Sequence, residues 1–230
     1  MEFGAFEMGL TGKTVSGAPY SAQIATQRSQ TLSDGTHVTQ QSTGAVYRDS
    51  AGRVRREMTM PALRSLTGSA KAPSGVFISD PVAGYHYVLH ADTKIADRMP
   101  SPAGFEGKER GARRLEREGA QVSTESLGTQ VIEGVNAEGT RITKTIPAGA
   151  IGNDKPIQIV TERWFSPDLQ VVVLLKHNDP WMGESTTRLT NISRTEPAAP
   201  LFAVPADYTV NDRPAPPAFG PRRGGPPPKD

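Results

Sequence analysis

Short stretches of alternating apolar and polar residues, separated by turn residues, follow one another along most of the chain. Tyr20, Ala22 and Ile24 share one face of the first stretch, and the turn Ser-Asp-Gly at 33–35 leads into a second stretch at 36–47. Alternation with a period of two is typical of β-strands, and Asp and Gly in the connection are typical of hairpin turns. The chain is therefore predicted to begin its fold with an antiparallel pair of strands.

Two further hairpins are predicted where turn residues separate strand-like stretches. Residues 49–52, Asp-Ser-Ala-Gly, precede a return strand at 53–60. Residues 166–168, Ser-Pro-Asp, separate strands at 157–165 and 169–176. Other strands are expected at 76–78, 85–90, 94–99, 129–135, 140–146, 186–193 and 208–210, with turns at 80–84, 136–139 and 179–183.

Roughly nine or ten short strands with almost no helical periodicity favour an all-β fold. A flat sheet of that width would curl or close. We therefore expect a large curved antiparallel sheet, a half-open barrel, with at most one or two short helices. Residues 171–175, Val-Val-Val-Leu-Leu, are apolar at consecutive positions, so this strand is predicted to be covered on both faces. Leu201 and Phe202 are predicted to close the core as a plug.

Three parts are expected along the chain. Residues 1–17 are predicted to form a Gly-rich N-terminal arm, residues 18–210 a single antiparallel β domain, and residues 211–230 a disordered Pro/Gly-rich tail. Within the β domain, residues 101–120 form a charged excursion that interrupts the strand pattern. This excursion is interpreted as a linker, a lid or a disordered segment.

Composition excludes several classes of protein. The 230 residues carry 26 Lys and Arg against 24 Asp and Glu, a formal charge of +2, which gives no case for nucleic-acid binding. The chain has no cysteine, so disulfides, thiolate metal sites and a Cys nucleophile are excluded. It has no apolar run long enough for a transmembrane segment. Its first residues do not look like a signal peptide, so either the protein is cytoplasmic or a signal has been removed.

No catalytic or metal-binding motif is found. His86 and His90 share one face of a predicted strand but would lie about 13 Å apart, so one zinc ion cannot take both. His177 and Asp179 could supply two ligands of a metal site at most, and no metal-binding motif includes His37. No nucleophile elbow, His-Glu-x-x-His, phosphate loop or dinucleotide fingerprint occurs. We expect a protein that is not an enzyme and has no cofactor, although a Ser-His-Asp triad assembled from distant residues stays open.

Four arginines lie close together in the sequence, at Arg48, Arg53, Arg55 and Arg56. On a strand, Arg53 and Arg55 share a face and could grip a phosphate or carboxylate. The simpler interpretation is an exposed strand whose charges deter edge pairing and are balanced by nearby acidic residues.

Several boxes of residues resemble a family of exported bacterial proteins, abundant in acidobacteria, that has no assigned activity. These boxes lie at 17–22, 46–57, 78–84, 133–135 with 138–140, 163–170 and 201–210. More distantly, the layout resembles the outer-membrane lipoprotein carrier (LolA-like) superfamily, through an aromatic strand, a Pro-containing turn, a long apolar strand and a late Leu-Phe-x-x-Pro closure. The resemblance implies a half-open barrel that holds acyl chains, and export to the periplasm or the outside of the cell after signal cleavage.

The leading hypothesis is an exported, non-enzymatic protein whose curved sheet binds an apolar or amphipathic, lipid-like molecule. The residues predicted to line the site are Tyr85, Tyr87, Trp164, Val171, Val173 and Leu175. The alternative is a structural or assembly protein of the cell envelope or extracellular matrix, which would use its arms and sheet edges to associate with itself or with an envelope partner. A hydrolase is the third hypothesis.

Overall fold

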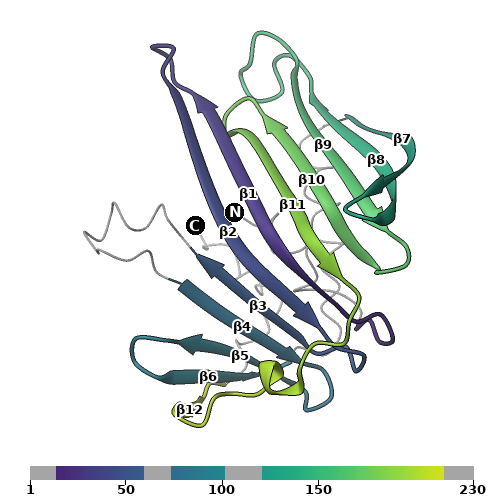
Figure 1. The fold of residues 1–230 in the computed structure, drawn as a ribbon. Helices are drawn as coiled ribbons and strands as arrows, with labels where there is room; N and C mark the ends of the chain where they lie inside the picture. The colour runs from purple at the N-terminus through teal and green to yellow at the C-terminus, as the bar shows by residue number, and fades with distance from the viewer. Residues whose placement is uncertain (1–13, 60–73, 102–120, 215–230) are drawn as a thin grey trace, which may run out of the picture.

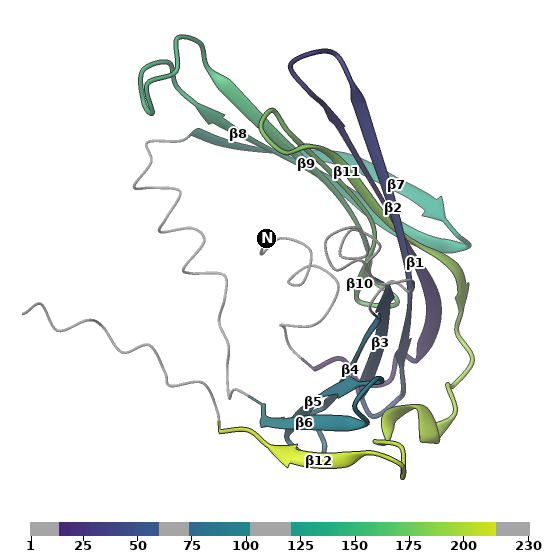
Figure 2. The same cartoon turned by 90° about the vertical axis from the view of Figure 1, so that its left-hand side faces the viewer.

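A computed structural model describes residues 14–59, 74–101 and 121–214 of the chain. Most of the predicted arm, most of the charged excursion and most of the predicted tail lie outside these residues. The described residues form one sheet that bends into a half-open barrel (Figures 1 and 2). Its strands are β1 (Tyr20–Thr31), β2 (His37–Arg48), β3 (Val54–Thr59), β4 (Ser74–Asp80), β5 (Tyr85–His90), β6 (Ile95–Pro100), β7 (Gln121–Ile132), β8 (Val135–Ile146), β9 (Ile157–Ser166), β10 (Val171–Asp179), β11 (Gly183–Ser193) and β12 (Thr209–Asp212).

The strands lie in the order β12-β6-β5-β4-β3-β2-β1-β11-β10-β9-β8-β7. Neighbouring strands are antiparallel except for β12, which pairs in parallel with β6. Among the described residues, the 3-10 helix η1 (Ala199–Phe202) is the one helical element. The predicted fold class, a large curved antiparallel sheet, is therefore confirmed, with more strands than expected.

One predicted turn is wrong. Residues 136–139 lie inside β8, and the chain reverses instead at Glu133 and Gly134, whose φ angles are 49° and 77°. Two consecutive residues with positive φ form the type of tight turn that suits the twist of a hairpin. The Asn and Gly of residues 136–139 gave a turn signal that the hydrogen bonding to both neighbouring strands overrides. β7 accordingly begins at Gln121, not at residue 129.

The far end of the β7–β8 hairpin packs over the neighbouring strands. A bulge follows Ser126, where Gly128 has a φ of 77°. Beyond it the hairpin tip reaches β11, because the backbone N–H of Asn191 donates to Glu133 at 3.2 Å. In Figure 1 these two strands curl at one side of the sheet. The larger core cluster joins this hairpin to the central strands and contains Tyr20, Ala22, Ile24, Val46, Val135, Ala137, Leu169, Val171, Val173 and Leu189.

A second core cluster lies at the other end of the sheet. Ile78, Leu89 and Ala96 pack there against Val204 and Tyr208 of the segment that follows η1. The neighbouring Phe202 is also buried, as expected for the plug. The chain then pairs β12 with β6 and so covers that edge of the sheet.

The apolar run in β10 is buried on both faces, as predicted. Val171, Val172, Val173 and Leu175 are all buried. Consecutive residues of a strand face opposite sides, so both sides of β10 are covered at this point. A bulge between Val172 and Leu174 shifts the pairing with β9 by one residue.

Candidate functional site

The curved sheet has an outer, convex face and an inner, concave face. Figure 2 shows η1 on the outside of the curve. Arg55 points to that side, because its guanidinium donates to the carbonyl oxygen of Leu201 at 3.1 Å. Since successive residues of a strand face opposite sides, Arg56 lies on the inner face, together with its partner Val46 in β2.

The same alternation identifies the inner face in the middle of the sheet. Val46 pairs with Ala22 of β1, and Ile24, two residues further along β1, lies on the same face and pairs with Leu189 of β11. Thr187, two residues before Leu189, pairs with Leu175 of β10, so Leu175 lies on this face as well. These inner-face residues, which we call the inner apolar belt, are Ala22, Ile24, Val46, Leu175 and Leu189, and all are buried.

Two arginines flank the inner apolar belt. Arg163 of β9 pairs with Leu175, and its guanidinium lies 5.0 Å from the centre of the Phe165 ring. Arg56, on the other side, is 1% exposed. Within the described segments, the Nε of each arginine is buried and has no hydrogen-bond partner. Burial lowers the pKa of Arg56, yet a guanidinium keeps its charge in proteins. An anionic group at either margin of the belt would complement the arginine there.

Arg48, beside Arg56, differs from it because its hydrogen bonds are made. Its Nε and Nη2 donate to the carbonyl oxygen of Ala18 at 3.0 and 2.7 Å, and Nη2 also donates to that of Leu169. The guanidinium lies 4.7 Å from the centre of the Tyr20 ring. Burial raises the pKa of the Tyr20 hydroxyl, so Tyr20 stays neutral. Arg48 therefore holds the backbone in place, whereas the Nε of Arg56 has no hydrogen-bond partner in the described segments.

The expectation of an exposed arginine cluster is wrong for two of its four members. Arg53 and Arg55 do form ion pairs with the nearby carboxylates, at 2.6 and 2.7 Å. Arg48 and Arg56 are buried, because the period of two sends them to the inner face. The sequence placed all four in one segment and could not show which face is covered.

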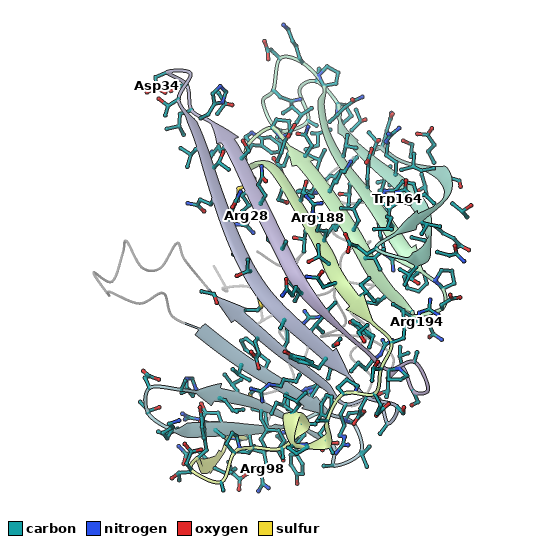
Figure 3. The ribbon with its side chains drawn as sticks, in the orientation of Figure 1. Arg28, Asp34, Arg98, Trp164, Arg188 and Arg194 are labelled. Carbon is teal, nitrogen blue, oxygen red and sulfur yellow. The ribbon has the colours of Figure 1, made fainter. Side chains whose placement is uncertain are left out.

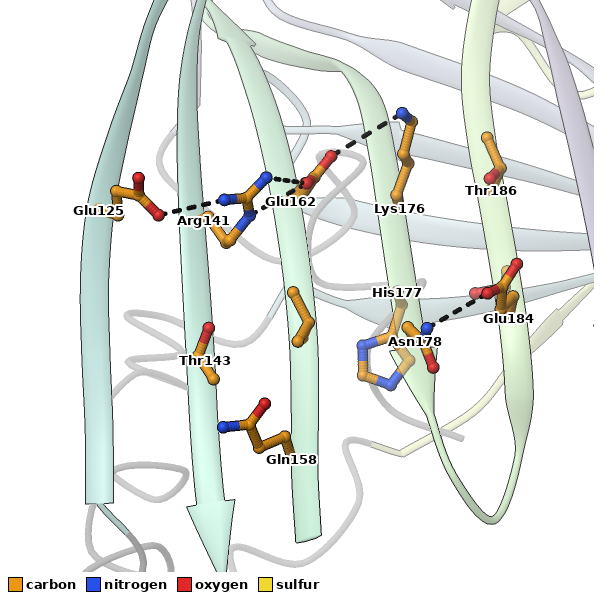
Figure 4. Close-up of a pocket in the computed structure, with 12 residues that line it drawn as sticks. Glu125, Arg141, Thr143, Gln158, Glu162, Lys176, His177, Asn178, Glu184 and Thr186 are labelled. Atoms are coloured by element: carbon orange, nitrogen blue, oxygen red, sulfur yellow. Dashed lines mark hydrogen bonds and ion pairs between the residues drawn. The ribbon is translucent and has the colours of Figure 1, made fainter.

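A pocket of about 640 Å³ lies on the outer face, over β7 to β11 (Figure 4). A row of charges crosses it from strand to strand. Arg141 bridges Glu125 at 3.1 Å and Glu162 at 2.7 Å, and Lys176 lies 3.8 Å from Glu162. These cross-strand pairs already neutralise one another. The pocket is therefore polar and open, and it does not fit an apolar guest. It could not be recognised in the sequence because its residues lie on five strands.

The six residues predicted to bind a ligand do not share one surface. Trp164 lies on the outer face (Figure 3) and packs against the larger core cluster. Tyr87 packs against the second cluster, with the Tyr85 ring 6.4 Å away. Val171 and Val173 are buried in the larger cluster, which also contains four of the five residues of the inner apolar belt. Leu175 alone is part of the inner apolar belt, and as a ligand-binding set the six residues stay a prediction.

The histidines are engaged in ordinary polar contacts. His86 Nε2 lies 3.0 Å from the Ser101 hydroxyl, and no carboxylate hydrogen-bonded to His86 is found among the described residues. His90 lies 3.3 Å from Asp97, and His177 lies 2.9 Å from the Thr161 hydroxyl. The described residues contain no group of three potential metal ligands. Nothing in this part of the chain assembles a hydrolytic triad or a metal centre.

Several solved structures are similar to this chain in fold. An uncharacterised conserved protein of Thermus thermophilus has 12% identity and a TM-score of 0.46, with 85% of this chain and 91% of that chain covered. The MucA/MucB complex of Pseudomonas aeruginosa has 10% identity and a TM-score of 0.45, with 85% of this chain and 58% of that chain covered. The chain therefore spans less than two thirds of that protein. A LolA superfamily protein of Nitrosomonas europaea has 8% identity and a TM-score of 0.36, with 81% of this chain and 90% of that chain covered.

LolA superfamily proteins are thus among the structures similar to this chain, as the distant resemblance of the sequence predicted. At such identities and TM-scores, nothing about a ligand or partner carries over. No family model and no curated protein matches the chain. The resemblance to an acidobacterial family stays a prediction. In the described segments, no helix has the length and hydrophobicity needed to span a membrane.

Proposed function

We propose that this protein is a non-enzymatic binding protein that holds an amphipathic, lipid-like molecule against the inner face of its curved sheet. The inner apolar belt would contact the acyl part of the ligand. Arg163, whose strand neighbour is Leu175, would attract an anionic headgroup, and Arg56, five strands away at the other margin of the belt, would attract a second anionic group. Of the residues predicted from the sequence, the proposal keeps Leu175 as wall of the site and assigns Trp164, Tyr85 and Tyr87 to packing on the outer face.

The observation that carries this proposal is the pair of arginines whose buried Nε groups have no partner in the described part of the chain. Leaving a buried donor of a charged group without a partner is costly, so such groups are normally paired. An apolar surface with an arginine at each margin, each with a buried Nε that has no partner in the described segments, suits a molecule with an apolar body and an anionic end at one margin. The outer pocket, where the charges are already paired, does not.

Two measurements test the proposal. The first is solvent extraction of the purified protein followed by mass spectrometry, in which we expect an acyl-containing species. The second is titration with an anionic apolar dye, with displacement by laurate and by dodecanol as its uncharged counterpart. We expect laurate to displace the dye at lower concentration, because the arginines favour the carboxylate.

A matched pair of variants places the site on one face. Arg163 lies on the inner face and Arg188 on the outer face, since Arg188 pairs with the neighbour of Leu175. Arg163→Gln should weaken binding of laurate about tenfold, the loss of one charge-assisted hydrogen bond. Arg188→Gln should leave it unchanged. Equal effects of the two substitutions, or no effect of either in folded protein, would rule out the inner face as the site.

The edge strand β7 favours a second candidate, an assembly protein of the cell envelope. All but two of its twelve residues are exposed, and no further strand pairs with its outer edge among the described residues. An open edge can add a strand from a second molecule. Light scattering over a range of concentrations decides, since a monomer at every concentration argues against self-assembly. Under either candidate, we expect the protein in the periplasm or outside the cell, which fractionation of the source bacterium would test.

A further inference from the structure

Three loops lie side by side at one end of the sheet, and we call them the three tip loops. They are the β1–β2 turn at 32–36, the β8–β9 loop at 147–156 and the β10–β11 turn at 179–183. The register places them together, because Ser29 pairs with Glu184 and Asn178 pairs with Val160. Figures 1 and 2 both show the three tip loops at the same end of the half-barrel.

Each tip loop exposes large apolar side chains. Trp181 is 50% and Met182 is 68% exposed, side by side in the β10–β11 turn. Ile151 of the β8–β9 loop and Leu32 of the β1–β2 turn are exposed as well. Single exposed apolar residues are common on protein surfaces. A Trp, a Met, an Ile and a Leu gathered on adjacent loop tips are not, and such groups mark interaction sites.

The backbone of each tip loop is fixed by an Asp or Asn side chain. Asp179 Oδ1 accepts hydrogen bonds from the backbone N–H of Trp181 at 2.8 Å and of Met182 at 3.3 Å. Asn153 accepts from the N–H of Ile151 at 3.2 Å and donates to the carbonyl oxygens of Pro147 and Lys155. Asp34 accepts from the N–H of Thr36 at 2.9 Å. These turns hold the apolar side chains outward, so presenting them costs little further ordering.

The β10–β11 turn is also anchored to its neighbour. The Gln30 amide donates to the carbonyl oxygen of Trp181 at 3.5 Å. A Cβ added to Gly183 would lie 2.3 Å from the carbonyl oxygen of Ser29. The turn therefore packs directly against the backbone of β1, with Trp181 exposed.

The shape and charge of this end fit a lipid bilayer. The apolar side chains project from separate tips and do not line a groove, so they match a deformable surface better than a folded partner. Trp and other amphipathic side chains favour the depth of the lipid headgroups. The three tip loops carry the acidic residues Asp34, Asp154 and Asp179 against one basic residue, Lys155. This balance predicts binding to zwitterionic lipid without help from anionic lipid.

We propose that the three tip loops dock the protein on a membrane by inserting Trp181, Met182, Ile151 and Leu32 among the headgroups of a zwitterionic bilayer. The site is separate from the inner apolar belt, so it stands whether or not the protein carries a lipid. The open end of the half-barrel would then face the membrane.

The test is sedimentation with phosphatidylcholine vesicles, together with quenching of tryptophan emission by lipids that are brominated along the acyl chain. We expect the wild-type protein to bind and its Trp181 emission to be quenched. The double variant Trp181→Ser/Met182→Ser should bind about tenfold more weakly, since two partly inserted apolar side chains are lost. Both residues lie in an exposed turn, and circular dichroism checks that the fold is kept.

The matched control uses apolar residues that are equally exposed at the opposite end of the sheet. Val82, in the β4–β5 turn, is 71% exposed, and Val131, near the β7–β8 turn, is 68% exposed. Val82→Ser/Val131→Ser should bind vesicles as the wild type does. The proposal is overturned if the wild type does not bind phosphatidylcholine vesicles, if both double variants bind alike, or if binding needs anionic lipid and is lost in salt.

Discussion

The contact between Gly139 and Trp164 tests how the β7–β8 hairpin is held against the sheet. A Cβ added to Gly139 would lie 2.6 Å from Cζ3 of the Trp164 ring and 2.8 Å from the Cβ of Leu127. Neither atom lies at the end of a flexible chain that could move away freely. Gly139→Ala therefore has to push the indole ring or the bulged part of β7 outward.

The expected loss follows from two opposing effects. Adding a methyl group to a filled core costs about 1–3 kcal/mol through strain. Replacing Gly by Ala in a conformation that both can adopt gains about 0.4–1 kcal/mol from the unfolded chain. Gly139 is not among the glycines with positive φ, so this gain applies. We expect Gly139→Ala to lower the free energy of unfolding by about 0.5–2 kcal/mol, the difference between these ranges.

A double-mutant cycle with Trp164→Leu isolates the contact. Urea unfolding is followed by circular dichroism, because the second substitution removes a fluorophore. In the Trp164→Leu background the loss caused by Gly139→Ala should shrink by about 1 kcal/mol, the coupling typical of residues in contact. If the alanine costs the same in both backgrounds, or stabilises the wild type, the packing of the hairpin on Trp164 described above is refuted.

Three other substitutions test the buried arginines and the histidines. Arg56→Met should raise the free energy of unfolding by about 1–2 kcal/mol in urea, because an apolar side chain replaces a buried cation whose Nε has no partner in the described segments, and should weaken laurate binding; a loss of stability would mean that Arg56 holds the fold. Arg48→Lys should destabilise by about 2–3 kcal/mol, since an ammonium cannot reach both carbonyl oxygens and stack on the Tyr20 ring; wild-type stability of this variant would contradict that role. Burial lowers the pKa of His86, so the folded protein binds fewer protons than the unfolded chain below about pH 6.5. The contribution of neutral His86 to the free energy of unfolding is present above that pH and is lost on acidification. His86→Asn should therefore reduce the fall in the free energy of unfolding between pH 7 and 5. An unchanged pH dependence would show that His86 does not cause this fall.

The strands that have a buried face were predictable because the period of two survives in their sequence. β5 has the predicted bounds, β1 ends one residue before its predicted range of 20–32, and β2 is shifted by one residue from its predicted range of 36–47. The β7–β8 turn was misplaced because Asn136 and Gly139 look like turn residues, whereas the turn needs positive φ at Glu133 and Gly134. Local composition cannot reveal which of two nearby Gly-containing sites closes the hairpin.

The candidate site was much less predictable than the fold. Alternation shows that Trp164 and Arg163 face opposite sides, but it does not say which side is concave. The six residues predicted from the sequence to line a site include Trp164 and Leu175, which face opposite sides of the sheet, so the set stays a prediction. The inward position of Arg56 depends on pairings across β1, β2 and β3, which only the three-dimensional structure gives.

Photo-cross-linking with a fatty acid that carries a diazirine on its chain tests the central claim most directly, when labelled residues are mapped by mass spectrometry. If the ligand lies on the inner face, labels should follow the alternation of the strands. They should fall on Ile24, Leu175 and Leu189 and spare their neighbours in the chain, Ala25 and Leu174. Labels on the outer-face neighbours, or no labelling that unlabelled fatty acid can compete away, would contradict the account.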